Sequence, residues 1–252
     1  MIHENRMSTA EWMPDDPMDH GYDMMIFDGD DERPERKKCK VMRKTAPEYS
    51  AKGLLYVPGM MEAGFPKDMA QMFNRHGYDF YTVDVSAMTR KKHPGEARYE
   101  QRELEDYFDG LRAGLEAMKN DGISEIVVLG HATGALAAIL FLQAYAEEGT
   151  DVTAAVMNSP FLSYNKIFEN DGGEWKRAVA IATKALEQNK VGVPILILTS
   201  DNMGSPIKGN NDNVTIFTVY DGEVDVSLEQ ADVKAVAYTE IFSWLQSKKT
   251  SH

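Results

Sequence analysis

The sequence has little cysteine, little basic charge and no long apolar segment. Its 252 residues contain a single cysteine, Cys39, so no disulfide can form within the chain, which suits a reducing cytosol. The formal net charge of -13 removes any electrostatic reason to bind nucleic acid or an anionic membrane. No apolar stretch approaches the roughly 20 residues that a membrane-spanning helix needs. The acidic N-terminal segment lacks the pattern of a signal peptide, so we expect a cytoplasmic protein without a membrane span.

The chain does have enough apolar content for one sizeable core. Hydrophobic residues make up 43% of the sequence, which fits a single α/β domain of this length. Residues 1–20 are rich in Met, Asp and Pro and lack periodicity, which predicts a flexible N-terminal arm. No linker, repeat or low-complexity tract divides the remainder, so residues 21–252 are predicted to form one domain.

The apolar pattern changes from hairpin-like to alternating along the chain. Strand-like runs at 22–27 and 40–44 flank an acidic turn and predict an antiparallel hairpin at a sheet edge. From Gly53 onward, strands are expected at 54–57, 80–85, 126–129, 152–157, 195–198 and 214–219, with helices at 65–73, 104–118, 135–145, 175–186 and 233–245. This alternation predicts an α/β fold with a doubly wound, mostly parallel sheet of about eight strands.

The most informative segment is Ile126–Leu136, where a buried strand leads directly into a helix. Between them the chain reads Gly-His-Ala-Thr-Gly at Gly130–Gly134, which matches the setting of the nucleophile elbow Gly-x-Ser-x-Gly. The glycines are needed because the turn is tight, and the middle residue lies at a helix N-terminus that stabilises an oxyanion. Here the middle residue is Ala132, which has no hydroxyl and cannot attack a carbonyl carbon.

Five short motifs in a fixed order carry more information than any one of them alone. They are Leu55–Gly59, Gly77–Asp84, Gly130–Gly134, Asn158–Phe161 and Val193–Asp201. As an ordered set they resemble the α/β-hydrolase superfamily, specifically its serine aminopeptidase/monoacylglycerol lipase-like branch. The resemblance implies the α/β-hydrolase fold. The superfamily usually inserts a cap domain between the last two of these motifs, and because only about 30 residues separate Phe161 from Pro194 here, the lid is expected to be reduced.

The resemblance also implies positions for a Ser–His–Asp triad, and two of the three are changed. The nucleophile position is Ala132, the acid position is Asp201, and the histidine position is Val224. After His131 the only histidine is His252, so no histidine is available in the chain order Ser…Asp…His. A laboratory Ser→Ala exchange would leave the histidine in place, so the double loss favours a natural absence.

An oxyanion-type site and a pocket are further implications of the resemblance. The backbone N–H groups of Met60 and Thr133 would form the oxyanion-type site. The candidates to line the former active-site pocket are His131, Ser159, Phe168 and Trp175. Simpler structural roles remain open for them: His131 packs beside the turn, Ser159 caps a strand, and Trp175 lies on the apolar face of a helix.

Together these patterns predict a catalytically inactive relative, a pseudo-hydrolase, that binds a small molecule or a partner protein in the former pocket. Two alternatives stay open. One is a serine esterase, lipase or aminopeptidase-like hydrolase that carries an inactivating Ser-to-Ala change. The other is an enzyme that uses Asp201 or Asp225 in non-triad chemistry. The sequence shows no ligand spacing typical of a metal site and no Gly-rich phosphate loop, so no metal or cofactor is expected.

Overall fold

A single open sheet runs through the part of the chain that the computed structural model describes. The described residues are 11–14, 21–27, 39–60, 62, 66–84, 104–145, 151–160, 162, 173–201, 207, 211–220 and 231–249. Their strands are β1 (Met13–Pro14), β2 (Asp23–Phe27), β3 (Cys39–Lys44), β4 (Lys52–Val57), β5 (Asp79–Asp84), β6 (Glu125–His131), β7 (Val152–Asn158), β8 (Ile195–Ser200) and β9 (Val214–Val219). The strand order is β1-β2-β3-β5-β4-β6-β7-β8-β9.

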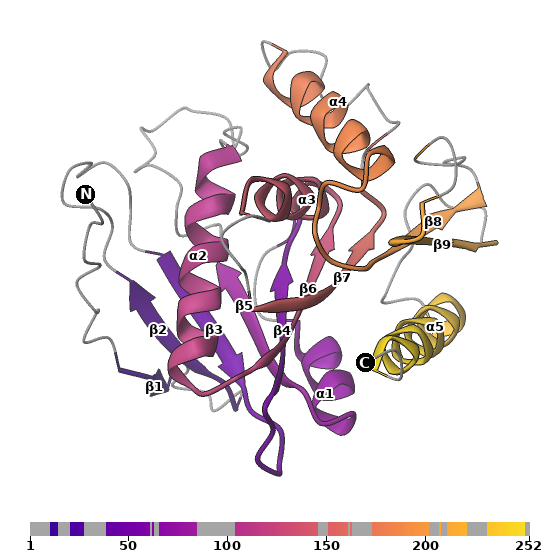
Figure 1. The fold of residues 1–252 in the computed structure, drawn as a ribbon. Coiled ribbons are helices and arrows are strands. Elements are labelled where there is room, and N and C mark those ends of the chain that lie inside the picture. The colour runs from indigo at the N-terminus through magenta and orange to yellow at the C-terminus, as the bar shows by residue number, and fades with distance from the viewer. Residues whose placement is uncertain are drawn as a thin grey trace, which may run out of the picture.

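Helices cover both faces of this sheet, as Figure 1 shows. The described helices are α1 (Lys67–Arg75), α2 (Leu104–Asn120), α3 (Thr133–Tyr145), α4 (Glu174–Glu187) and α5 (Ala231–Lys249). Helices α2 and α3 lie on one face, with α4 packed against α3, while α1 and α5 lie on the other. None of these helices is both long enough and apolar enough to cross a bilayer.

Strand β6 lies at the centre of the sheet because its side chains are apolar on both sides. Ile126 and Val128 enter the core under α2 and α3, whereas Val127 and Leu129 enter the core under α1 and α5. A strand buried on both faces is typical of a parallel sheet, since helices then cover each face. The strand pairs in parallel with β4 on one side and β7 on the other.

The predicted fold class is confirmed. Strands β2 to β9 supply the expected eight, and every pairing from β5 through β9 is parallel. The expected hairpin is the antiparallel pair of β2 and β3, in which Phe27 pairs with Cys39. Most element bounds differ from the predicted ones by one to a few residues. The short strand β1 was not predicted.

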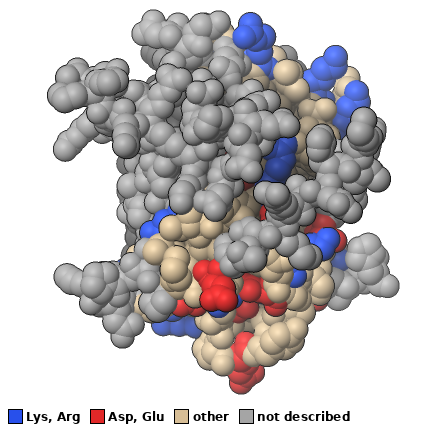
Figure 2. Space-filling view, turned by 90° about the vertical axis from the view of Figure 1, so that its left-hand side faces the viewer, with Lys and Arg blue, Asp and Glu red and all other residues tan. Residues whose placement is uncertain are grey.

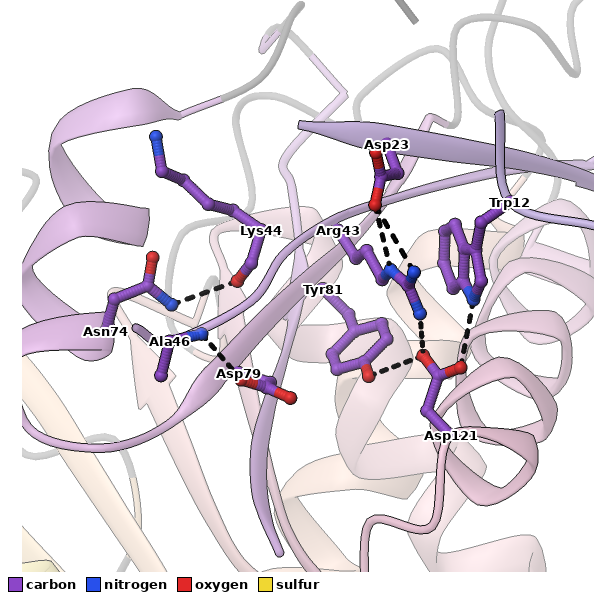
Figure 3. Close-up of polar contacts among 9 residues, drawn as sticks. All are labelled: Trp12, Asp23, Arg43, Lys44, Ala46, Asn74, Asp79, Tyr81 and Asp121. Carbon is purple, nitrogen blue, oxygen red and sulfur yellow. Dashed lines mark hydrogen bonds and ion pairs between the residues drawn. The ribbon is translucent and has the colours of Figure 1, made fainter. Parts of the chain in front are cut away.

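Trp12, inside the predicted N-terminal arm, packs against one end of the sheet. Its indole N–H donates to Asp121 Oδ1 at 2.9 Å, and its ring centroid is 4.0 Å from the guanidinium carbon of Arg43 (Figure 3). Met13 and Pro14 then pair with β2. Residues 1–10 and 15–20 lie outside the described part of the chain, so the predicted arm and its boundary at residue 20 stay a prediction.

Figure 2 shows where the charged side chains of the described residues lie on one face of the molecule. On the face that Figure 2 shows, the described Lys and Arg side chains are scattered and do not form one continuous patch. Described Asp and Glu side chains gather in the lower part of the same view.

Candidate functional site

The turn between β6 and α3 has the strained backbone of a nucleophile elbow. Ala132 has a φ of +52°, in the left-handed region that residues with a side chain seldom occupy. Its N–H donates to the Asn158 carbonyl at 3.0 Å, and its carbonyl accepts the Leu136 N–H at 3.2 Å. The turn is therefore bonded to β7 on one side and begins α3 on the other. The predicted nucleophile position keeps this geometry but presents a methyl group in place of a hydroxyl.

The two glycines of the turn leave no space for a side chain. A Cβ on Gly130 would lie 2.5 Å from the Ala135 Cα. A Cβ on Gly134 would lie 2.5 Å from the Pro58 carbonyl oxygen and closer still to that of Val57. Because these neighbours are backbone atoms, no change of rotamer can remove the clash. The helix α3 is thus pressed against the end of β4.

The loop that follows β4 lies directly against the elbow. A Cβ on Gly59 would lie 3.3 Å from the Ala132 Cβ. The Met60 N–H donates to Thr133 Oγ1 at 2.8 Å, and the same oxygen is 3.1 Å from the Tyr107 hydroxyl. The fold therefore brings Met60, Thr133 and Ala132 together, which are three of the residues that the sequence predicted for the site.

Glu62 is a site residue that the sequence pattern did not single out. Its carboxylate oxygens lie 2.9 and 2.8 Å from the Tyr56 hydroxyl, and Oε1 lies 2.7 Å from His131 Nδ1. The Gly59 N–H donates to Oε2 at 2.6 Å, and the Glu62 N–H donates back to the Gly59 carbonyl at 3.1 Å. The available signal was an acidic residue in a short Pro-Gly-Met-Met-Glu loop that has no other charged side chain.

The negative charge of Glu62 is stabilised by its partners. Burial by itself would raise the pKa of the carboxyl group. The hydrogen bond and charge of His131 act in the opposite direction, and the Gly59 N–H and Tyr56 hydroxyl add to them. The pKa of Glu62 consequently falls below its usual value. His131 is thereby paired with a carboxylate beside the turn.

Ser159 and Asp201 follow the next two strands at the same edge of the sheet. Ser159 is buried, has a φ of +46°, and donates its N–H to the Leu198 carbonyl at 2.9 Å. Asp201 comes directly after β8 and is exposed. Since parallel strands end at one edge, the nucleophile and acid positions share that edge with Ser159. In the ranges given above, no three His, Cys, Asp or Glu side chains are grouped as metal ligands.

Trp175 lies near the start of α4 and is buried in the core on the same face as the elbow. Its ring centroid is 6.4 Å from that of Tyr107 in an edge-on contact, and Tyr107 in turn reaches Thr133. Trp175 is thus two contacts away from the elbow. Phe168, Val224 and Asp225 lie outside the described residues.

Comparisons with known proteins give the same architecture. A family model described as serine aminopeptidase, S33, matches residues 50–221. An esterase from Pyrococcus furiosus is similar with a TM-score of 0.62 and 16% identity, over 95% of each chain. Est1E from Butyrivibrio proteoclasticus gives a TM-score of 0.61 and 15% identity, over 90% of this chain and 99% of its own.

A monoacylglycerol lipase from Paleococcus ferrophilus gives a TM-score of 0.57 and 13% identity, over 82% of this chain and 98% of its own. No curated protein sequence matches the chain. At these identities the likeness to solved structures shows the fold alone, whereas the family model covers more than half of the chain.

Proposed function

Because the chain belongs to the serine aminopeptidase S33 family of α/β-hydrolases, we propose that it is a pseudo-hydrolase, which keeps the family fold without the hydrolytic reaction. The observation that supports this most is at the elbow. Ala132 retains the left-handed φ of +52° between two crowded glycines, and yet it carries no hydroxyl. A turn with this geometry and a methyl group at the predicted nucleophile position supports the proposal.

The loss at the histidine position supports the same conclusion. A serine needs an adjacent base to take its proton, and no histidine follows His131 except the final residue, His252. In serine hydrolases, removing the nucleophile or the histidine alone lowers kcat by about a millionfold, and removing both costs little more. Because the predicted histidine position is occupied by Val224, Asp201 at the acid position has no imidazole to orient.

In this proposal the former active-site pocket binds a small molecule or a partner protein in the cytoplasm. The candidate lining residues are His131, Ser159, Phe168 and Trp175, with backbone N–H groups of Met60 and Thr133 as an oxyanion-type site. The retained strain at Ala132 supports a recognition role. A left-handed alanine costs about 1 kcal/mol more than a glycine, so a turn kept only for stability would be better made with glycine.

The proposed loss of hydrolytic activity is tested by assays of the purified, unmutated protein. We expect no turnover of p-nitrophenyl esters or aminoacyl anilides above background, and no covalent labelling by a fluorophosphonate. Steady turnover, or a label on Ser159 or Thr133, would refute the proposal.

The single variant Ala132→Ser separates the pseudo-hydrolase from a hydrolase with an inactivating change. It supplies a hydroxyl but no base, so we expect it to stay inactive. Appreciable esterase activity of this variant would mean that a base is present, and the alternative of an inactivated serine hydrolase would then be correct.

A further inference from the structure

The backbone N–H of Met60, in the loop beside the elbow, already donates a hydrogen bond to an oxygen of the protein itself. In a working elbow, the N–H of the residue after the nucleophile and an N–H from the neighbouring strand-to-helix loop bind the oxyanion. These positions correspond to Thr133 and Met60. In this structure the Met60 N–H donates to the Thr133 side-chain oxygen at 2.8 Å.

We propose that the Thr133 hydroxyl is an internal latch, which occupies the oxygen-binding position of this loop and competes with a ligand oxygen for the Met60 N–H. This inference rests on the proposed function, because Met60 and Thr133 take their role from the family fold. It goes further in naming the residue that competes with a ligand oxygen at one of the two donors of the site.

The surroundings of Thr133 fix its hydroxyl in this position. Thr133 and Tyr107 are both buried, with 1% and 0% of their surface exposed, and the Tyr107 hydroxyl is 3.1 Å from Thr133 Oγ1. Tyr107 is packed edge-on against Trp175. A threonine in a helix has few allowed side-chain rotamers, so the Oγ1 oxygen is preorganised toward the Met60 N–H.

The neighbouring N–H groups of the site are bonded internally as well. The Gly59 N–H donates to Glu62 Oε2 at 2.6 Å, and the Ala132 N–H donates to the Asn158 carbonyl at 3.0 Å. A ligand oxygen that bound Met60 would therefore replace an existing hydrogen bond instead of adding one. Exchange of one acceptor for another gains little free energy, so the latch weakens the binding of any oxygen ligand.

The Met60 amide can be observed alone. Gly59-Met60 is the only Gly-Met pair in the sequence, so a chain labelled with carbonyl-13C glycine and 15N methionine gives a single correlated amide signal. We expect this amide to be protected from hydrogen exchange in the natural chain. Thr133→Val keeps the shape and removes the acceptor, and it should speed exchange by about tenfold or more. Thr133→Ser keeps the hydroxyl and should leave the rate close to the natural one.

An unprotected Met60 amide in the natural chain would overturn the latch, and so would equal exchange rates in the Val and Ser variants. The natural-chain measurement does not depend on how well a variant folds. Tyr107→Phe gives a second variant, which leaves Thr133 in place but removes its hydroxyl partner. We expect a smaller increase in exchange from it than from Thr133→Val.

The functional consequence is measured after the triad positions are refilled. In an Ala132→Ser/Val224→His background, we expect Thr133→Val to raise kcat for p-nitrophenyl acetate by about tenfold over Thr133→Ser, with little change in KM. Equal kcat values would show that the latch does not control oxygen binding. If all these variants are silent, the amide measurement decides alone. Failure of the pseudo-hydrolase proposal is seen separately, as turnover by the natural chain.

Discussion

Two polar networks lie at opposite ends of β6, and they stabilise different parts of the fold. At the start of the strand, the Asp121 carboxylate accepts hydrogen bonds from Trp12 at 2.9 Å and from Arg43 and Tyr81 at 2.7 Å (Figure 3). At its end, Glu62 and Thr133 bond the loop N–H groups around the elbow. The first network joins the N-terminal segment, β3 and β5 to the turn before β6. The second surrounds a strained turn without its reactive group.

The network around Asp121 has a structural role. Stability alone does not explain the network around the elbow. Burial and then the hydrogen bond with Asp121 raise the pKa of Tyr81, so its hydroxyl stays protonated and remains a donor. Each group in that network therefore has a partner of suitable charge. At the elbow the partners are equally good, but they surround a left-handed Ala132 that a glycine would make less strained.

Gly134→Ala should be the most damaging single change. The added Cβ would overlap the carbonyl oxygens of Val57 and Pro58, so we expect the free energy of unfolding to fall by at least about 3 kcal/mol in urea titrations. Gly77→Ala is the matched control, because its φ is +76° and nothing lies within 4 Å of the added atom. The control should lose only about 1 kcal/mol. Equal losses would show that the elbow is not closed by sterics.

Asp121→Ala should break the network at the other end of β6. The change leaves the Trp12 and Tyr81 donors without their acceptor and removes one of the two carboxylates that bind the Arg43 guanidinium, which keeps Asp23. We expect a loss of about 2–4 kcal/mol in the same titrations. Asp109→Ala removes a more exposed carboxylate that pairs with Arg112 at 3.1 Å within one helix. That control should cost about 0.5 kcal/mol or less. A similar loss in both variants would argue against Asp121 as the centre of its network.

Ala132→Gly should stabilise the protein, whereas Ala135→Gly should destabilise it. Both remove one methyl group from a buried alanine, but only Ala132 has a positive φ. We expect a gain of about 0.5–1 kcal/mol at position 132 and a loss of about 1 kcal/mol in the helix. Thermal unfolding measures both. A loss at position 132 would mean that its methyl group contributes more to packing than the strain costs.

Glu62→Gln should reduce stability by an amount that depends on pH. Because the folded state lowers the pKa of Glu62, its contribution is complete above the ordinary value of 4.5 and is lost as the pH falls through the lower folded value. The variant should therefore differ from the natural chain most at neutral pH and least in acid. A difference that stays constant with pH would contradict the assigned ionisation.

Asp79→Asn should change the stability at neutral pH in the opposite direction to Glu62→Gln. Burial raises the pKa of Asp79; the Ala46 N–H opposes this and the charge of Asp121 adds to it. The ionised form thus lowers stability above the folded pKa, and this cost disappears as the pH falls below 3.8. The amide can still accept the Ala46 N–H, so we expect a small gain in stability at neutral pH and none in acid. A loss at neutral pH would show that the carboxylate is needed as a charge.

Much of the fold could be predicted because the signals are local. The apolar run of β6 spans a few consecutive residues, and the apolar spacing of α2 repeats over a few consecutive helical turns. The absence of a hydroxyl at Ala132 and of a downstream histidine needs no structure, since it concerns residue types. Strand β1 could not be predicted, because two residues carry no periodicity. The role of Glu62 could not be predicted because it depends on a partner, His131, that is 69 residues away in the sequence.

The α/β architecture, the place of the elbow and the lack of a nucleophilic side chain at Ala132 all follow from the order and type of the residues along the chain. Which groups meet at the elbow and at the other end of β6 depends instead on how distant elements pack. The Met60 N–H bonds a side chain 73 residues away, His131 lies against a carboxylate 69 residues away, and Trp12 reaches Asp121 over 109 residues. Hydrogen bonds at such separations depend on how whole helices and strands pack, because no local pattern fixes the distance between their side chains.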